Sequence, residues 1–162
     1  MNPVYILSAT RTAVGSFGGS LKDTSPIDLG THIAKSAIER SGVAADAIDH
    51  AVIGNVIHTE PRDMYVSRCI SIGAGMREGA PALTVNRLCG SGLQAIASAS
   101  QLIMLGDAEL ALAGGVEVMS RSGHIVPSLR WGVRMGNADI HDMMLGALHD
   151  PFGIGHMGIT AE

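Results

Sequence analysis

The chain has 162 residues, which is enough for one domain with a substantial core. Its formal net charge of −4, from 11 Lys and Arg against 15 Asp and Glu, gives no basic footprint for nucleic acid or acidic membranes. The N-terminus lacks the pattern of a secretory signal and two cysteines are too few for a disulfide framework, so we expect a cytoplasmic protein.

Strands and helices alternate along the chain up to about residue 120. Apolar runs predict strands over 4–9, 51–57 and 82–85, and a fourth strand begins at 110. A first helix is predicted between an N-cap at Ser25 and a stop at Gly42; others are predicted over 63–74 and after Cys89. This order predicts right-handed crossovers and a layered βαβαβαβ core, an α/β fold with a largely parallel sheet.

Beyond residue 120 the sequence has many glycines, scattered histidines and little periodicity, apart from a helical patch over 139–149. We interpret 1–120 as an α/β domain and 121–162 as the incomplete beginning of a second domain that covers a site. Thr160 is expected to cap a helix that starts at the end of the chain. Charged residues make up 16%, against roughly 25% in ordinary domains, so we expect a piece of a longer protein.

The helix predicted after Cys89 carries no charged residue over 88–106. A membrane span needs about 20 predominantly apolar residues. Serines and glutamines interrupt this run, however, and glycines lie in its first turns. The better interpretation is a central helix buried on all sides by protein, with its N-terminus inside the molecule beside Cys89.

Cys89 is the main candidate for chemistry. A helix N-terminus stabilises a thiolate, which is the nucleophilic form of cysteine, and its N–H groups can hold a developing oxyanion. A lone cysteine in an apolar sequence is also a common packing residue, and position alone leaves both interpretations open. Cys69, in the middle of a predicted helix, has no such setting and is expected to be structural.

Other motifs are weaker. Residues 153–158 fit the dinucleotide pattern G-x-G-x-x-G, but no predicted strand precedes them. The histidines and acids over 141–156 have no spacing typical of a compact site, so no metal is expected. Ser91 lies in Gly-Ser-Gly without a full nucleophile elbow, and we expect it to be a structural turn residue.

The segment VNRLCGSGLQAIASASQLI resembles the acyl-enzyme signature of the thiolases, the acyl-CoA acetyltransferase family. SATRTAVGSFGGSLKD, GNVIHTEPRDMY, LALAGGVEVMSR and HMGIT are similar to further segments of that family, so the resemblance spans essentially the whole chain. Within the family, RMGNADIHDMMLGALHDPF is most similar to biosynthetic and broad-specificity β-ketothiolases.

The resemblance implies that Cys89 is acylated in a ping-pong exchange between acyl-CoA substrates. It implies that His156 and Met157 lie near the pantetheine and acyl end of coenzyme A. It also implies no cofactor, and a homodimer or homotetramer when the protein is complete. The family's acid/base histidine and second cysteine belong to a C-terminal half, so we expect this chain to be inactive alone.

Three alternatives stay open. The first is a non-catalytic, thiolase-like module that binds CoA esters. The second is a degradative 3-ketoacyl-CoA thiolase. The third is a related ketosynthase, although NRLCGSG differs from the usual serine- and alanine-rich context of the ketosynthase cysteine.

Overall fold

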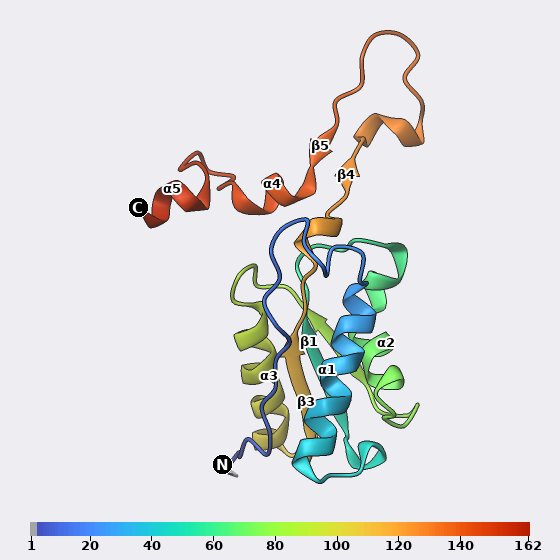
Figure 1. Cartoon of the computed structure of the whole chain (residues 1–162), viewed down its shortest axis with the longest axis vertical. Coiled ribbons are helices and arrows are strands. Elements are labelled where there is room, and N and C mark those ends of the chain that lie inside the picture. The colour runs from blue at the N-terminus through green and yellow to red at the C-terminus, as the bar shows by residue number, and fades with distance from the viewer. Residues whose placement is uncertain (1–2) are drawn as a thin grey trace.

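The computed structural model describes residues 3–162 and shows an α/β core followed by an extended segment (Figure 1). The core contains α1 (Pro26–Ser41), β1 (His50–Gly54), α2 (Val66–Gly73), β2 (Ala82–Val85), α3 (Ser91–Leu105) and β3 (Ala111–Gly115). The segment after the core contains β4 (His124–Ile125), β5 (His141–Asp142), α4 (Met143–Leu148) and α5 (Met157–Ala161).

β1 is the central strand of a parallel sheet with the order β2-β1-β3. Successive residues of β1 face opposite sides of the sheet. Ala51 and Ile53 pack in the core cluster beneath α1 and α2, whereas Val52 packs with Ala95 and Ala99 of α3. The sheet therefore lies between two helical layers, and the predicted α/β fold is confirmed (Figure 1). The carboxyl ends of all three strands lie at one edge.

The first helix begins and ends where the sequence predicts. The hydroxyl of Ser25 accepts a 3.1 Å hydrogen bond from the backbone N–H of Asp28. Gly42 ends the helix with φ 71, a left-handed conformation that glycine adopts at little cost. The apolar face of α1 is buried, through Ile27, Ala34 and Ile38.

Residues 4–9 do not form the predicted strand. The segment is extended and lies along α1, where the hydroxyl of Ser8 donates a 2.7 Å hydrogen bond to the carbonyl of Ala37. Tyr5 and Ile6 are 75% and 78% exposed. An extended apolar run becomes a strand only when a neighbouring strand pairs with it, and no other segment of 3–162 does so.

α3 is buried on one face only, which corrects the prediction of burial on all sides. Ala95 is fully buried against the sheet, whereas Leu93 and Leu105 are each 77% exposed. By length and composition alone, Leu88–Leu105 could cross a membrane, but a core helix passes the same test. The outward face of α3 carries apolar side chains such as Leu93 and Leu105, and no segment of residues 3–162 covers them.

Other boundaries differ from the prediction in detail. The second helix begins with a 3-10 turn at Pro61–Tyr65, and the predicted helix over 139–149 shortens to α4. Thr160 is not an N-cap: α5 starts at Met157, and a ring nitrogen of His156 accepts the Gly158 N–H at 3.0 Å. The chain between β4 and β5 extends away from the core, and α4 returns to the end of the core (Figure 1). The division into two domains at residue 120 stays a prediction.

Candidate active site

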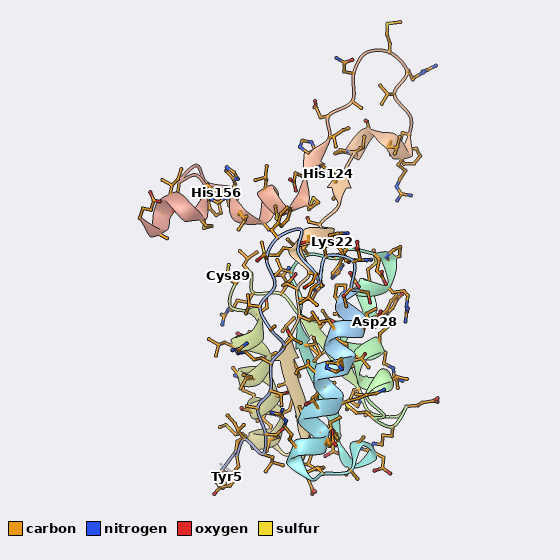
Figure 2. The ribbon with its side chains drawn as sticks, in the orientation of Figure 1. Tyr5, Lys22, Asp28, Cys89, His124 and His156 are labelled. Atoms are coloured by element: carbon orange, nitrogen blue, oxygen red, sulfur yellow. The ribbon has the colours of Figure 1, made fainter. Side chains whose placement is uncertain are left out.

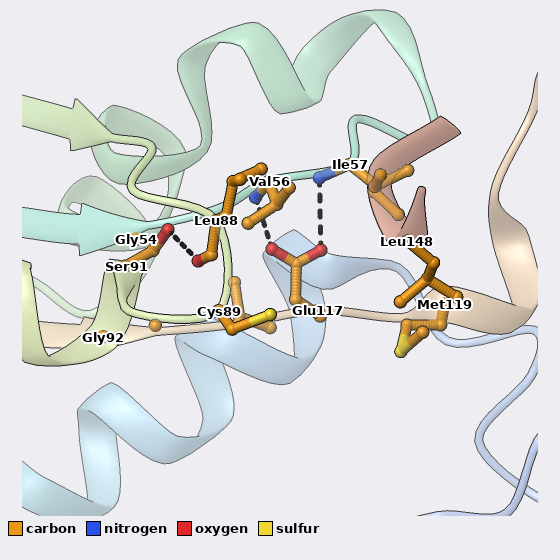
Figure 3. A pocket seen from close by; sticks show the side chains of 13 residues that line it. Gly54, Val56, Ile57, Leu88, Cys89, Ser91, Gly92, Glu117, Met119 and Leu148 are labelled. Carbon is orange, nitrogen blue, oxygen red and sulfur yellow. Dashed lines mark hydrogen bonds between the residues drawn. The ribbon is translucent and has the colours of Figure 1, made fainter. Parts of the chain in front are cut away.

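Loops from all three strands meet at the carboxyl edge of the sheet and line an open cavity of about 400 Å³. Val56 and Ile57 follow β1, Cys89 follows β2, and Glu117 follows β3. Leu148 of α4 lines the same cavity from the extended segment (Figure 3). The site is therefore built where parallel α/β sheets commonly bind ligands.

The turn that carries Cys89 is held by its own neighbours. The side-chain oxygen of Asn86 accepts a 2.9 Å hydrogen bond from the Leu88 N–H. The hydroxyl of Ser91 accepts a 2.9 Å bond from the Arg87 N–H and donates a 2.6 Å bond to the Leu88 carbonyl. These bonds place Cys89 two residues before α3, as predicted, and they confirm that Ser91 is a turn residue.

The thiol of Cys89 is exposed and lines the cavity, so it is not a buried packing residue. Cys69 differs: it is half-buried in α2 and packs against the core cluster beneath α1, as a structural cysteine would. Both cysteines are free. The structure thus favours chemistry at Cys89 over the packing interpretation that the sequence left open.

Two glycines let the N-terminus of α3 approach the sheet closely. A Cβ atom on Gly54 would lie 2.6 Å from the backbone carbon of Ser91, and one on Gly115 would lie 3.2 Å from the Cα of Gly92. A side chain at Gly54 would therefore push α3 away from β1. These contacts set the distance between the Cys89 turn and the sheet edge.

Glu117 is a site residue that the sequence reasoning missed. Its carboxylate accepts hydrogen bonds from the backbone N–H groups of Val56 and, at 3.3 Å, Ile57 (Figure 3). Much of the side chain is exposed, but loss of hydration in the cavity raises the pKa of Glu117 above its usual 4.5, while those N–H groups act to lower it. The sequence did contain a signal for Glu117: it follows the fourth predicted strand, and the carboxyl ends of parallel strands lie at the same edge of the sheet.

His156 and Met157 are not brought to the cavity. His156 caps α5, and its ring packs edge-on against His149 with the centroids 5.0 Å apart. Met157 is 37% exposed on the same helix, and the residues of this segment that line the cavity are Ala147 and Leu148. Figure 2 shows His156 on the extended segment and Cys89 on the core. Within residues 3–162, histidine, cysteine and acidic side chains form no group of three that could hold a metal ion.

Comparisons with known proteins agree over the whole chain. The sequence profile of the family described as "Thiolase, N-terminal domain" matches residues 4–162. "Beta-ketothiolase BktB" of Cupriavidus necator is 57% identical over 159 residues, which are 98% of this chain and 40% of that protein. "Acetyl-CoA acetyltransferase" of the same species is 44% identical over 100% of this chain and 41% of its own length.

Solved structures give the same answer. Human mitochondrial 3-ketoacyl-CoA thiolase, crystallised in complex with CoA, superposes with a TM-score of 0.92 and 36% identity. The superposition covers 97% of this chain and 40% of the human chain. The acetyl-CoA acetyltransferase of Bacillus anthracis superposes with a TM-score of 0.90 at the same identity. The 162 residues thus span about 40% of the length of the proteins they match.

Proposed function

This chain belongs to the thiolase family, and we propose that it provides the nucleophilic cysteine of an acyltransferase that forms or cleaves 3-ketoacyl-CoA. The observation that carries the proposal is the exposed thiol of Cys89, which lines a cavity and lies two residues before the start of α3. A helix N-terminus favours the thiolate, and the thiolate is the nucleophile.

In the proposed first step, the Cys89 thiolate attacks the carbonyl carbon of an acyl-CoA thioester. The new C–S bond forms to Cys89, the C–S bond to CoA breaks, and CoA leaves as a thiolate that takes up a proton. In the second step, the acid/base pair that the family carries in its C-terminal half removes an α-proton from acetyl-CoA, and the resulting enolate attacks the acyl group on Cys89. A C–C bond forms, the Cys89 thiolate is released, and the product is a 3-ketoacyl-CoA; thiolysis is the reverse.

The cavity walls suit an uncharged acyl group. Val56, Ile57 and Leu148 present apolar surface beside Cys89, so an acetyl or short alkyl chain would replace water there favourably. The names of the relatives agree, since BktB is a β-ketothiolase and the second relative is an acetyl-CoA acetyltransferase. We therefore propose acetyl-CoA and short 3-ketoacyl-CoA as the substrate class.

We also propose that His156 and Met157 contact coenzyme A in the complete protein. In His156, Nδ1 accepts the Gly158 N–H, so Nε2 is the ring nitrogen that remains for a contact to substrate. We further propose that the protein works in the cytoplasm, needs no cofactor, and is a homodimer or homotetramer in its complete form. The 162-residue chain alone lacks the family's acid/base pair and is expected to show no turnover.

The decisive experiment follows a single acyl transfer rather than turnover. The chain is incubated with acetyl-CoA, digested, and analysed by mass spectrometry beside the Cys89→Ser and Cys69→Ser variants. We expect an acetyl group on the peptide that contains NRLCGSG in the wild type and in Cys69→Ser, and none in Cys89→Ser. Acetylation of Cys69 alone, or of neither cysteine, would overturn the proposal.

A further inference from the structure

We propose that Glu117 is a positioning residue of the Cys89 cavity: its carboxylate holds the loop after β1 in the place where that loop forms the cavity wall. The consequence for acyl transfer rests on the function proposed above. The structural role can be measured separately from acyl transfer. In that role, the Glu117 carboxylate, in the loop after β3, fixes the backbone of the loop after β1.

The backbone at Val56 and Ile57 presents two N–H donors that suit an anionic acceptor. The chain bends there, directly after β1, and the N–H groups of Val56 and Ile57 converge on one side chain. Two neighbouring N–H groups that point the same way create a local positive potential, which a carboxylate satisfies better than a neutral acceptor. Glu117 supplies one oxygen to each N–H, so it fixes both wall residues at once.

Glu117 also completes a series of bonds that continues the sheet beyond its strands. The backbone N–H of Val116 donates a 3.0 Å bond to the carbonyl of Gly54. The side-chain amide of Asn55 then donates a 2.9 Å bond to the carbonyl of Val116. Glu117 makes the next connection, to Val56 and Ile57. Asn55 anchors the root of the loop, whereas the side chain that holds Val56 and Ile57, among residues 3–162, is Glu117.

Asp49 provides a matched control at the opposite edge of the sheet. One of its carboxylate oxygens accepts bonds from the backbone N–H groups of Glu109, at 2.9 Å, and Leu110, at 3.1 Å. Like Glu117, it joins the β1 and β3 chains through two successive N–H groups. It lies before β1, away from the carboxyl edge that carries Cys89, so its loss should affect stability without affecting the cavity.

The experiment compares Glu117→Gln with Asp49→Asn and the wild type, under conditions in which each chain is folded. Hydrogen exchange measured by mass spectrometry reports on the peptide that contains Val56 and Ile57. The rate of Cys89 acetylation, over a range of acetyl-CoA concentrations, reports on the cavity. Glutamine keeps the size of the side chain but offers one acceptor oxygen for two N–H groups.

We expect Glu117→Gln to lose protection at Val56 and Ile57 and to slow Cys89 acetylation roughly 10- to 100-fold, as misplaced reactive groups do. Asp49→Asn should leave both quantities unchanged. An unchanged acetylation rate in Glu117→Gln, or an equal loss in Asp49→Asn, would overturn the inference.

If the wild type itself takes up no acetyl group, the proposed function fails. The positioning role of Glu117 is then tested by two other measurements: hydrogen exchange at Val56 and Ile57, and the rate at which iodoacetamide modifies Cys89. Changes in both, confined to Glu117→Gln, support the positioning role, and an unchanged pair rejects it.

Discussion

The hydroxyl of Ser91 donates a 2.6 Å hydrogen bond to the carbonyl of Leu88, the residue that immediately precedes the candidate nucleophile. Leu88 has φ 46, a left-handed conformation that costs a side-chain-bearing residue on the order of 1–2 kcal/mol. Among residues 3–162 it is the one non-glycine residue with positive φ. The bonds from Ser91 and Asn86 hold this strained turn, and the turn directs the Cys89 thiol into the cavity.

Ser91→Ala should therefore weaken the turn. The change removes two hydrogen bonds at a side chain that is 5% exposed, and we expect it to cost about 1–3 kcal/mol in the free energy of unfolding. Reaction of Cys89 with iodoacetamide should slow as well. Ser100→Ala is the control, because the hydroxyl of that half-buried serine donates to the carbonyl of Ile96 within α3, away from the Cys89 turn. Equal effects of the two changes would contradict the role assigned to Ser91.

Gly54→Ala tests the close contact between β1 and α3. The new Cβ would lie 2.6 to 2.8 Å from backbone and side-chain atoms of Ser91, so α3 must move. We expect a loss of about 3 kcal/mol, the upper end of ordinary overpacking, measured by urea denaturation. Gly114→Ala on β3 is the control, since nothing lies within 4 Å of its Cβ position. A similar small loss in both variants would show that α3 adapts.

The features that sequence could predict depend on local chemistry. Ser25 and Gly42 delimit α1 because caps act within one turn, and the apolar run around Val52 marks a strand covered on both faces. The strand expected over 4–9 could not be judged locally, since a strand needs a partner that lies elsewhere in the chain. Sequence spacing alone could not show that Val56, Cys89 and Leu148 line the same cavity.

The candidate site divides in the same way. Cys89 was predictable because a cysteine between a strand and a helix is a local pattern. Glu117 could have been found by following the strand order to the common edge. Leu148 could not, because its approach to Cys89 depends on the path of the irregular chain over 122–142.

Asp49 should make the stability of the chain sensitive to acid. Hydrogen bonds from the N–H groups of Glu109 and Leu110, and the Arg77 guanidinium at 2.8 Å, lower the pKa of Asp49 below its usual 3.8. The unfolded chain then takes up this proton first as pH falls. The contribution is complete above the unfolded value of 3.8 and is lost as pH falls through the lower folded value.

Urea denaturation at neutral pH and at decreasing acid pH measures this effect. Asp49→Asn should be less stable than the wild type at neutral pH, and the difference should shrink on acidification. Asp46→Asn, at an exposed position on the preceding 3-10 turn, controls for the loss of one surface carboxylate. A difference between Asp49→Asn and wild type that stays constant with pH would exclude a role for the charge.

The outward face of α3 should make the 162-residue chain self-associate or bind hydrophobic dye. Leu93 and Leu105 are each 77% exposed, and Ile96 is 42% exposed on the same helix. Large apolar side chains exposed together on one helix favour association or dye binding. Leu93→Glu with Leu105→Glu should reduce dye binding and shift the chain toward monomer in analytical ultracentrifugation. A monodisperse wild-type monomer that binds no dye would refute the expectation.

The last prediction concerns the two cysteines. Near neutral pH, iodoacetamide should modify Cys89 at least about tenfold faster than Cys69, because helix termini and exposure favour a reactive thiolate. Cys89 meets both conditions: it lies two residues before the start of α3 and is exposed to the cavity. Cys69 meets neither, since it lies within α2 and packs against the core. Prior incubation with acetyl-CoA should protect Cys89 and leave the rate at Cys69 unchanged. Peptide mass spectrometry over time distinguishes the two sites. Faster labelling of Cys69 in the folded chain would mean that the Cys89 thiol is not activated, and the acyl-transfer proposal would lose its nucleophile.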